Sequence, residues 1–465
     1  MKIEQIYTGC LAQGAYFISS GNEAVVIDPL RDPQPYIDKA KAENLTIKYI
    51  FETHFHADFV SGHVDLAQRT GATIVFGPNA QTNYPSKIAE DGEILPLGNI
   101  TFKVLHTPGH TMESTCYLLL DEQGLPHSMY TGDTLFIGDV GRPDLAQKSG
   151  ELTTEDLAGK LFDSLRNKVM PLPDSVIVYP AHGAGSACGK NMSKETFDLL
   201  GHQKAVNYAL RSDMTKSEFV KELTDGIAPP PAYFAENVRM NKTGYQSLES
   251  VVERGLQALT PDEFEARANE TGALILDTRK QEAFAQGFIP NSIFIGIDGG
   301  FAPWVGALIT DINQPILIVA DEGRETEVVQ RLARVGYDQS IGYLKGSFGA
   351  WKAAGKETDS IVSIPATQFS ESITAESKIL DVRKPGEYNP EHVSGAVNMP
   401  LDNISQQMSS LDKNQHYYIH CAGGYRSMIY ASILKARGYE NLTDVAGGYA
   451  AIKQTGVAKS TIACS

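Results

Sequence analysis

The sequence lacks any long apolar run. No stretch of about 18 consecutive apolar residues occurs, which is the shortest length expected for a transmembrane helix. The N-terminal segment MKIEQIYTGC has no basic stretch followed by an apolar one, so neither an export signal nor a lipid anchor is indicated. These absences predict a cytoplasmic protein that does not contact a membrane.

Basic residues and cysteines are also scarce. The chain has 40 Lys and Arg against 56 Asp and Glu, which gives a formal net charge of −16. Because nucleic-acid binding depends on cationic side chains that displace counterions, this balance argues against a nucleic-acid partner. Five cysteines without paired spacing do not form a disulfide framework, and they indicate a reducing compartment in which thiols stay free. Cys116, in the apolar run CYLLL, is expected to pack in a core.

The length and the apolar pattern predict an α/β protein with several domains. At 465 residues the chain is too long for one core, since domains usually contain about 100–200 residues. Short β-like runs first alternate with loops and helical patterns, and a helical, proline-rich segment follows over residues 203–250. We therefore place the first domain at residues 1–250.

The remaining chain contains an internal repeat of about a hundred residues. The segment ALILDTRKQEAF (273–284) corresponds to KILDVRKPGEY (378–388), and the loop VADEGRET (319–326) corresponds to HCAGGYRS (420–427). Each copy alternates strand and helix at the spacing of a parallel α/β sheet. We expect two small, doubly wound α/β domains, residues 251–357 and 358–465.

Residue types that bind metal ions stand at the ends of successive apolar runs. They are His54, His56, Asp58, His110, Asp133 and His182. A single loop histidine is usually solvated or hydrogen-bonded. Six such groups at strand ends, where open α/β sheets expose ligand sites, predict a metal site instead.

The motifs that contain these residues resemble the metallo-β-lactamase superfamily. They are THFHAD (53–58), TPGHT (107–111), TGDTLF (131–136) and PAHG (180–183), and the resemblance covers residues 1–250. It implies a four-layer αββα sandwich with the metal at one sheet edge. Members of the superfamily include β-lactamases, glyoxalase II hydrolases and persulfide dioxygenases, so the superfamily alone leaves the reaction open.

Phe59 helps to choose among these reactions. In the two-zinc hydrolases of the superfamily, the residue after the motif's aspartate is a histidine that binds the second metal, and a benzene ring donates nothing. Resemblance to the persulfide dioxygenases then implies one Fe(II) per chain, bound by His54, His110 and Asp133. Two histidines and one carboxylate form the facial arrangement of non-haem Fe(II) oxygenases, which leaves positions open for substrate and O2.

The other polar groups have supporting roles in this interpretation. His56, Asp58 and His182 orient the ligands or hydrogen-bond a bound sulfur or oxygen, or they serve packing and loop structure alone. Arg142, in GDVGRPD, pairs with a substrate carboxylate or is a solvated loop arginine. Cys188, in AHGAGSACGK, is expected beside the metal pocket, where a reactive thiolate would receive or present a persulfide.

A second constellation is the loop HCAGGYRS (420–427), which lies between an apolar strand and a helical pattern. Its glycines allow backbone N–H groups and a helix N-terminus to face the Cys421 sulfur, which suits a nucleophilic cysteine that carries sulfane sulfur. Arg426 adds a positive charge for anions such as thiosulfate or sulfite. We expect the other loop residues to contact the substrate: Ala422, Gly423, Gly424, Tyr425 and Ser427.

The second copy of the repeat resembles the rhodanese family. The resemblance rests on LDVRKPGEY, EHVSGAVNMP, CAGGYRS and the closing AGGYAA. The first copy has no cysteine in its loop, and Asp321 and Glu322 would repel the anions that a rhodanese accepts. We expect that the first copy has lost sulfur transfer and helps to position the outer domains.

The whole chain resembles the multidomain persulfide dioxygenase–sulfurtransferases of bacterial sulfide detoxification. That resemblance implies oxidation of low-molecular-weight thiol persulfides with O2 to sulfite, and formation of thiosulfate at Cys421. No motif selects the thiol among coenzyme A, glutathione, bacillithiol and cysteine, and we expect a homo-oligomer. The alternatives are a zinc thioester hydrolase of the glyoxalase II type with a rhodanese tail, and a persulfide carrier or sensor.

Overall fold

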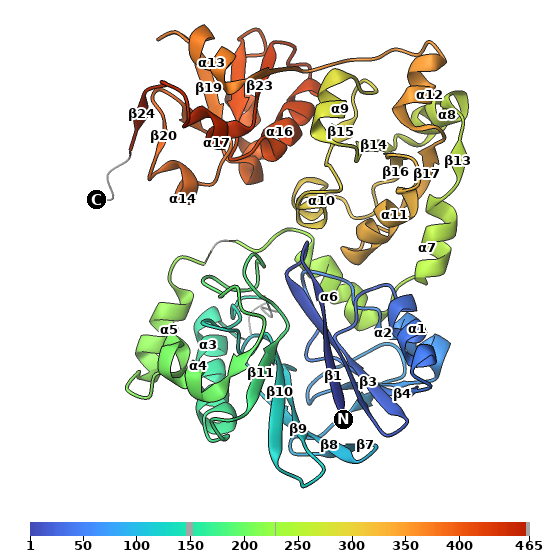
Figure 1. Ribbon diagram of the computed structural model, residues 1–465, viewed down its shortest axis with the longest axis vertical. Coiled ribbons are helices and arrows are strands. Elements are labelled where there is room, and N and C mark those ends of the chain that lie inside the picture. The colour runs from blue at the N-terminus through green and yellow to red at the C-terminus, as the bar shows by residue number, and fades with distance from the viewer. Residues whose placement is uncertain (146–151, 228, 462–465) are drawn as a thin grey trace. The chain divides into compact units, whose positions relative to one another are not determined.

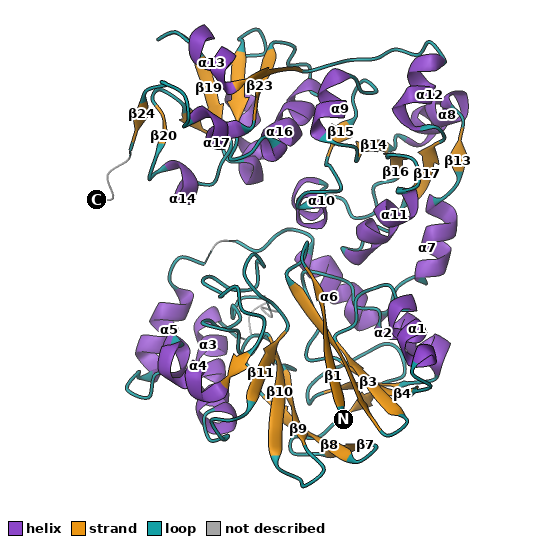
Figure 2. Ribbon diagram, in the orientation of Figure 1, coloured by secondary structure: helices purple, strands orange, loops and turns teal. Residues whose placement is uncertain are grey.

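The computed structural model describes residues 1–145, 152–227 and 229–461. Contacts divide the chain into two compact units. Unit 1 is Met1–Leu248 with Ala333–Gly336, and unit 2 is Glu249–Leu332 with Tyr337–Ser465. Figure 1 follows the chain by colour, and Figure 2 shows that both units combine helices with strands.

Unit 1 contains two six-stranded sheets. The first has the order β1-β2-β3-β4-β5-β6, with bounds β1 (Lys2–Thr8), β2 (Gln13–Ser20), β3 (Glu23–Ile27), β4 (Thr46–Phe51), β5 (Thr73–Phe76) and β6 (Lys87–Ile88). The second has the order β12-β11-β10-β9-β8-β7, with bounds β7 (Ile94–Leu97), β8 (Ile100–His106), β9 (Thr115–Leu120), β10 (Pro126–Gly132), β11 (Ile177–Pro180) and β12 (Asp198–Leu199). Antiparallel and parallel pairs occur in both sheets.

Helices cover the outer faces of these two sheets. Their bounds are α1 (Gln34–Ala42), α2 (His63–Thr70), α3 (Thr154–Ser164), the π-helix η1 (Leu165–Val169), α4 (Leu200–Val206), the 3-10 helix η2 (Tyr208–Leu210), α5 (Lys216–Thr224) and α6 (Phe234–Thr243). The helix α7 (Leu248–Gly255) follows them in the chain.

Alternation of side chains along the strands explains the layers. In β2, Ala15 and Phe17 pack into a core shared with α1 and α2, whereas Tyr16 and Ile18 pack against the second sheet. A third core joins the second sheet to α3 and α5, and Cys116 packs there, as predicted. The N-terminal part of the chain is therefore the expected αββα sandwich.

Unit 2 contains two five-stranded parallel sheets with the same topology. We call the first sheet and its helices module 1, with the order β13-β17-β16-β14-β15. Module 2 has the order β18-β23-β22-β19-β21. The strands are β13 (Ala258–Leu259), β14 (Leu274–Asp277), β15 (Ile293–Phe294), β16 (Ile316–Val319), β17 (Ser340–Leu344), β18 (Val362–Pro365), β19 (Lys378–Asp381), β21 (Val397–Asn398), β22 (Tyr417–His420) and β23 (Leu442–Ala446). The shared order confirms the internal repeat.

Short helices connect the strands of each module. Those of module 1 are α8 (Pro261–Thr271), α9 (Gln281–Gln286), α10 (Phe301–Leu308), α11 (Glu325–Arg334) and α12 (Ser347–Ala353). Those of module 2 are α13 (Ala366–Ser372), α14 (Pro385–Tyr388), η3 (Leu401–Asn403), α15 (Ile404–Gln407), η4 (Met408–Ser410), α16 (Tyr425–Lys435) and α17 (Gly448–Ile452). A two-stranded sheet of β20 (His392–Val393) and β24 (Lys459–Ser460) completes module 2.

Throughout the described ranges, no helix is both long enough and apolar enough to cross a membrane.

Candidate metal centre and sulfur-carrying loop

Four loops of unit 1 carry the predicted metal-site residues. His54 follows β4, His110 follows β8, Asp133 follows β10 and His182 follows β11. Because each residue lies just beyond the end of its strand, folding of the two sheets brings the four loops to one edge of the sandwich. All four side chains are almost completely buried.

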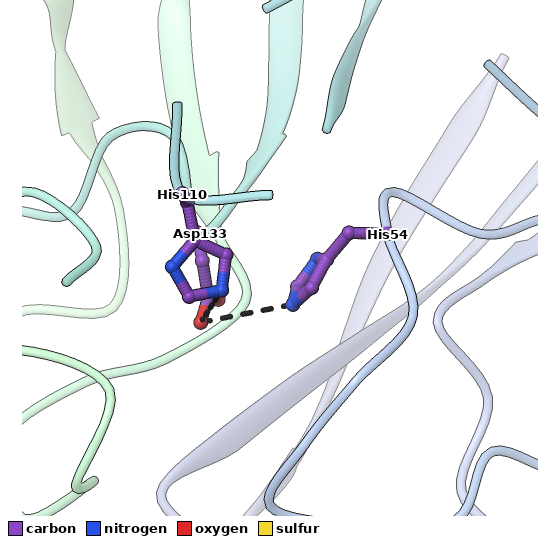
Figure 3. Close-up of side chains that lie close together, drawn as sticks. All are labelled: His54, His110 and Asp133. Carbon is purple, nitrogen blue, oxygen red and sulfur yellow. Dashed lines mark ion pairs between the residues drawn. The ribbon is translucent and has the colours of Figure 1, made fainter. Parts of the chain in front are cut away.

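The three residues predicted to bind iron lie together. The Oδ2 atom of Asp133 is 3.4 Å from Nε2 of His110 and 3.8 Å from Nε2 of His54. The two imidazole rings are nearly perpendicular, with centroids 4.9 Å apart. Figure 3 shows the ends of His54 and Asp133 directed toward one another beside His110. One ligand atom from each residue lies within 4.8 Å of the others, a spacing that one metal ion can occupy.

Hydrogen bonds at Nδ1 orient both imidazoles. Nδ1 of His110 lies 2.7 Å from the carbonyl oxygen of Arg142, which only accepts, so Nδ1 carries the proton and Nε2 is free to bind a metal. His54 Nδ1 lies 2.9 Å from Oγ1 of Thr53, and that hydroxyl donates to Asp28. The Thr53 oxygen therefore accepts from His54, which leaves Nε2 of His54 facing Asp133.

The charge state of these groups suits a cation. Burial and the neighbouring residues His56, His110 and His182 hold the pKa of His54 well below its usual value, so its imidazole is neutral. Within the described part of the chain, neither carboxylate oxygen of Asp133 has a hydrogen-bond partner, although both are buried. A buried carboxylate without hydrogen bonds is costly unless cations lie near it, so these residues fit a metal ion.

His56 has carboxylate neighbours outside this group of three. Its Nε2 atom lies 3.1 Å from Oδ1 of Asp28 and 3.7 Å from Oε2 of Glu52. The buried ring of Phe59 packs on the His56 imidazole, with centroids 4.3 Å apart. Asp28 and Glu52 were not predicted as site residues from the sequence. Both are carboxylates at the ends of apolar runs, EAVVID and IKYIFET, and this same position indicated the other residues.

Asp58 and His182 form a buried pair on the other side of Asp133. His182 Nε2 is 3.4 Å from Oδ2 of Asp58 and 3.7 Å from Oδ1 of Asp133. Burial opposes a charge on His182, but the two carboxylates raise its pKa well above the usual value. His182 in turn lowers the pKa of Asp58 despite the burial of that carboxyl group. The pair is therefore ionic when no metal is bound.

Cys188 reaches the same site, as expected from its position in the sequence. Its sulfur lies within 4.8 Å of ligand atoms of Asp133 and His182. Burial, Asp58 and Asp133 raise the pKa of the Cys188 thiol to about 12, although His182 opposes this effect. The thiolate expected from the sequence does not form next to these residues alone, because the nearest charges include two carboxylates.

Arg142 contacts two loops beside the site. Its Nε and Nη2 atoms donate to the two oxygens of Asp144, at 2.6 and 2.7 Å, and Nη1 donates to the carbonyl oxygen of Ala187. The backbone N–H of Arg142 donates to the carbonyl oxygen of Cys188. Arg142 therefore joins the loop after β10 to the Cys188 loop, and its role toward a substrate stays a prediction.

A cavity of about 680 Å³ opens beside His110. Small-molecule sites usually have volumes of about 300–1,000 Å³ and mostly apolar walls. The apolar side chains that line this cavity include Phe55, Met112, Leu145, Phe234 and Val238. A small substrate can therefore reach the metal-site residues from this side.

The Cys421 loop has the geometry predicted for an anionic sulfur. The N–H of Gly424, which precedes α16, donates to Sγ of Cys421 at 3.1 Å. Ser427 Oγ donates to the carbonyl oxygen of Gly424. Behind the loop, the N–H of Tyr449 donates to the carbonyl oxygen of Cys421 at 2.6 Å. The N-terminus of α16 and the N–H group of Gly424 stabilise negative charge on the Cys421 sulfur.

The remaining loop residues differ in what they contact. Arg426 donates to both oxygens of Glu387, at 2.7 Å each, so its charge is partly neutralised within module 2. The N–H of Ala450 donates to the carbonyl oxygen of Ala422, and Gly423 is exposed. The Tyr425 hydroxyl donates to the backbone of module 1, at the carbonyl oxygen of Gly296.

The corresponding loop of module 1 contains no cysteine. Arg324 of this loop donates to Asp298 and Glu327. Asp321 and Glu322 stand in the loop, and none of its residues is a nucleophilic cysteine. The inactive loop predicted from the sequence thus contains an arginine that is already paired with carboxylates.

Comparison with protein families identifies three regions of the chain. Residues 8–182 match the metallo-beta-lactamase superfamily. Residues 260–354 and 365–455 each match the rhodanese-like domain.

Individual relatives were found for the N-terminal part and for most of the chain. Hydroxyacylglutathione hydrolase from Tolumonas auensis is 33% identical over 36% of this chain, which spans 60% of that relative. Hydroxyacylglutathione hydrolase GloC from Haemophilus influenzae is 28% identical over 42% of this chain and 98% of its own length. The crystal structure of a metallo-beta-lactamase from Staphylococcus aureus subsp. aureus COL is 32% identical with a TM-score of 0.65, covering 74% of this chain and 98% of that chain.

Proposed function

Since the chain belongs to the metallo-β-lactamase superfamily and carries two rhodanese-like domains, we propose that it is a persulfide dioxygenase with sulfurtransferase activity. The N-terminal domain oxidises a low-molecular-weight thiol persulfide with O2 and water, and releases sulfite, the thiol and protons. The terminal sulfur of the persulfide loses four electrons, and O2 accepts them. The second rhodanese-like domain converts sulfite to thiosulfate.

The observation that carries this proposal is the pairing of Phe59 with His56. Phe59 offers no ligand atom to a second metal, and His56 is held at Asp28 and Glu52 rather than beside Asp133. The remaining compact group of His54, His110 and Asp133 is a donor set of two imidazoles and one carboxylate. This set is typical of mononuclear Fe(II) oxygenases.

The residues around the donor set would bind and orient the substrate. Fe(II) held by His54, His110 and Asp133 would supply the redox chemistry between the persulfide sulfur and O2. The apolar cavity beside His110 holds the carrier thiol and limits the access of water. His182 and Cys188 border the same site and are placed to hydrogen-bond the terminal sulfur.

Cys421 performs the transfer step. A persulfide on Cys421 gives its outer sulfur to sulfite, so that one sulfur–sulfur bond forms in thiosulfate and one breaks. Cys421 leaves as the thiolate, which the N–H of Gly424 stabilises. Sulfite, the product of the first reaction, is thus the sulfur acceptor in the second reaction.

A second candidate function is hydrolysis of a thioester by two zinc ions. It is favoured by a second buried group, His56, Asp58 and His182, whose ligand atoms also lie within 4.8 Å of one another. Relatives that match the N-terminal part are hydroxyacylglutathione hydrolases. A carrier or sensor that only stores sulfur on Cys421 is a third candidate.

The test is anaerobic purification with metal quantification, followed by O2 uptake with a panel of thiol persulfides. We expect about one iron per chain, as the donor set predicts, and sulfite formation that depends on O2. Two zinc ions per chain with thioester cleavage in the absence of O2 would reject the proposal in favour of the hydrolase. Sulfite formation that survives His110→Ala would reject it in favour of the carrier.

A further inference from the structure

Tyr425 occupies the point where the sulfur-carrying loop becomes helix α16. It is the first residue of α16, and the preceding N–H, that of Gly424, donates to the Cys421 sulfur. The direction of this N–H and of the helix N-terminus depends on how the first turn of α16 is held. Because both groups stabilise negative charge on sulfur, their direction controls how reactive the sulfur is.

The side chain that holds this turn is bound by module 1, within unit 2. The Tyr425 hydroxyl donates to the carbonyl oxygen of Gly296 at 2.6 Å. Its ring packs edge-on against Phe294, with centroids 5.9 Å apart. A Cβ atom added at Gly299 would lie 2.3 Å from the Tyr425 ring, so no larger residue fits there while Tyr425 is docked.

Two further contacts from module 1 and the segment after it support the same helix, and a side chain of module 1 lies beside the loop. The N–H of Phe294 donates to the buried hydroxyl of Ser432 in α16 at 3.0 Å. The amide nitrogen of Gln281 lies 3.3 Å from the position that a Cβ of Gly424 would occupy. Lys435, the last residue of α16, pairs with Asp359 at 3.1 Å. Both ends of α16 are therefore fixed from outside module 2.

We propose that module 1 is a positioning partner for the Cys421 loop, and that by docking Tyr425 it keeps the Gly424 N–H and the N-terminus of α16 directed at the sulfur. Docking favours the thiolate and the persulfide anion of Cys421. It gives a role to a rhodanese-like domain that has no cysteine of its own in its loop. The inference rests on the sulfur-transfer part of the proposed function and is independent of the metal centre.

The experiment uses the full-length chain and follows alkylation of Cys421 by iodoacetamide as a function of pH, with the Cys421 peptide quantified by mass spectrometry. Gly299→Ala displaces the Tyr425 ring, and Tyr425→Phe removes its hydrogen bond to Gly296. Gly349→Ala, in α12 of module 1, is the matched control, because a Cβ there meets no atom within 4 Å. Transfer of sulfur from thiosulfate to cyanide is measured on the same samples.

We expect Gly299→Ala to shift the alkylation profile to higher pH and to lower both alkylation at neutral pH and sulfur transfer about tenfold, equivalent to about one pKa unit. Tyr425→Phe should produce a smaller shift in the same direction, and Gly349→Ala should match the wild type. An unshifted profile in both Tyr425→Phe and Gly299→Ala would overturn the inference.

A double variant separates docking from general loss of structure. If Gly299→Ala lowers sulfur transfer through the clash with the Tyr425 ring, the double variant Gly299→Ala with Tyr425→Ala should transfer sulfur as fast as Tyr425→Ala alone. Additive losses would contradict the inference. If Cys421→Ser leaves sulfur transfer intact, the proposed transferase function fails. If Cys421→Ser abolishes transfer but Gly299→Ala and Tyr425→Phe leave the alkylation profile unchanged, only the inference fails.

Discussion

At the scale of single residues, Phe59 packs beside a buried group, His56, Asp58 and His182, that could hold a cation. Its ring is completely buried against His56, and it lies next to Asp58, which pairs with His182. A nitrogen donor at residue 59 would join two groups that are already placed to bind a cation. The structure therefore predicts that a histidine at residue 59 would complete a second metal site.

Phe59→His should raise the metal content from about one to about two ions per chain after loading with zinc, because a borderline cation accepts imidazole readily. The same variant should lose most O2 uptake with a persulfide when loaded with iron. Inductively coupled plasma mass spectrometry and an oxygen electrode measure the two effects. Phe59→Leu is the control, and it should keep one ion per chain; a single ion in Phe59→His would show that Phe59 does not limit the metal number.

Asp444 is a second residue whose environment has a measurable consequence. Burial raises the pKa of this carboxyl group in β23 to about 6, although the hydrogen bond from Ser363 and the nearby hydroxyl of Ser427 lower it. Unfolding returns the pKa to a value of about 4. The folded protein therefore keeps the proton over this interval while the unfolded chain releases it, so stability is lost as the pH rises through about 6.

Asp444→Asn should remove this loss, because the amide keeps an acceptor oxygen and carries no charge. Relative to the variant, the wild type should lose about 3 kcal/mol of unfolding free energy in module 2 between pH 4 and pH 7. Hydrogen exchange of peptides that contain β23, followed in urea at each pH, measures the difference. A constant difference across the interval would mean that Asp444 is ionised throughout.

At the scale of elements, the ends of strands and the turns after them create both sites. β4, β8, β10 and β11 each end just before one of the metal-site residues. β22 and β23 end at the Cys421 loop and at the turn that supports it. Gly448 follows β23 with φ of +56°, and a Cβ there would lie 2.5 Å from the carbonyl oxygen of Cys421.

Gly448→Ala should reduce sulfur transfer at least about tenfold, because both the backbone strain and the clash displace the Cys421 loop. O2 uptake with a persulfide should remain at the wild-type value. Gly386→Ala in the same module is a suitable control, since nothing lies within 4 Å of the added Cβ. Equal transfer rates in the two variants would show that the loop tolerates movement at this contact.

At the scale of the whole molecule, one chain joins a metallo-beta-lactamase fold with a candidate metal site to two rhodanese-like modules. The two modules of unit 2 share a topology, yet only module 2 has a cysteine at the end of the central strand. Module 1 contributes contacts to α16.

Cys421→Ser should leave O2 uptake unchanged and shift the product from thiosulfate to sulfite, because the oxygenase step does not use Cys421. Ion chromatography of the products, with a persulfide as substrate, measures the ratio. Addition of an independent sulfurtransferase should restore thiosulfate. An unchanged ratio of the two products would remove Cys421 from the mechanism.

The sequence by itself determined the layers, the repeat and the set of candidate residues. Alternating apolar runs specify which face of a strand is buried, and turn residues specify where strands end, so the αββα sandwich and the two parallel sheets could be predicted. The grouping of His54, His110 and Asp133 was implied by resemblance to a known family, and the structure places the three side chains together.

Only the tertiary structure decided which partner each side chain meets. Arg142 pairs with Asp144, burial and two carboxylates raise the pKa of the Cys188 thiol, and His56 is held by Asp28 and Glu52. The docking of Tyr425 on module 1 likewise could not be predicted from the sequence of the Cys421 loop. The physical reason is that local patterns encode burial and turns, whereas pairing energies depend on groups that distant segments bring within a few ångströms.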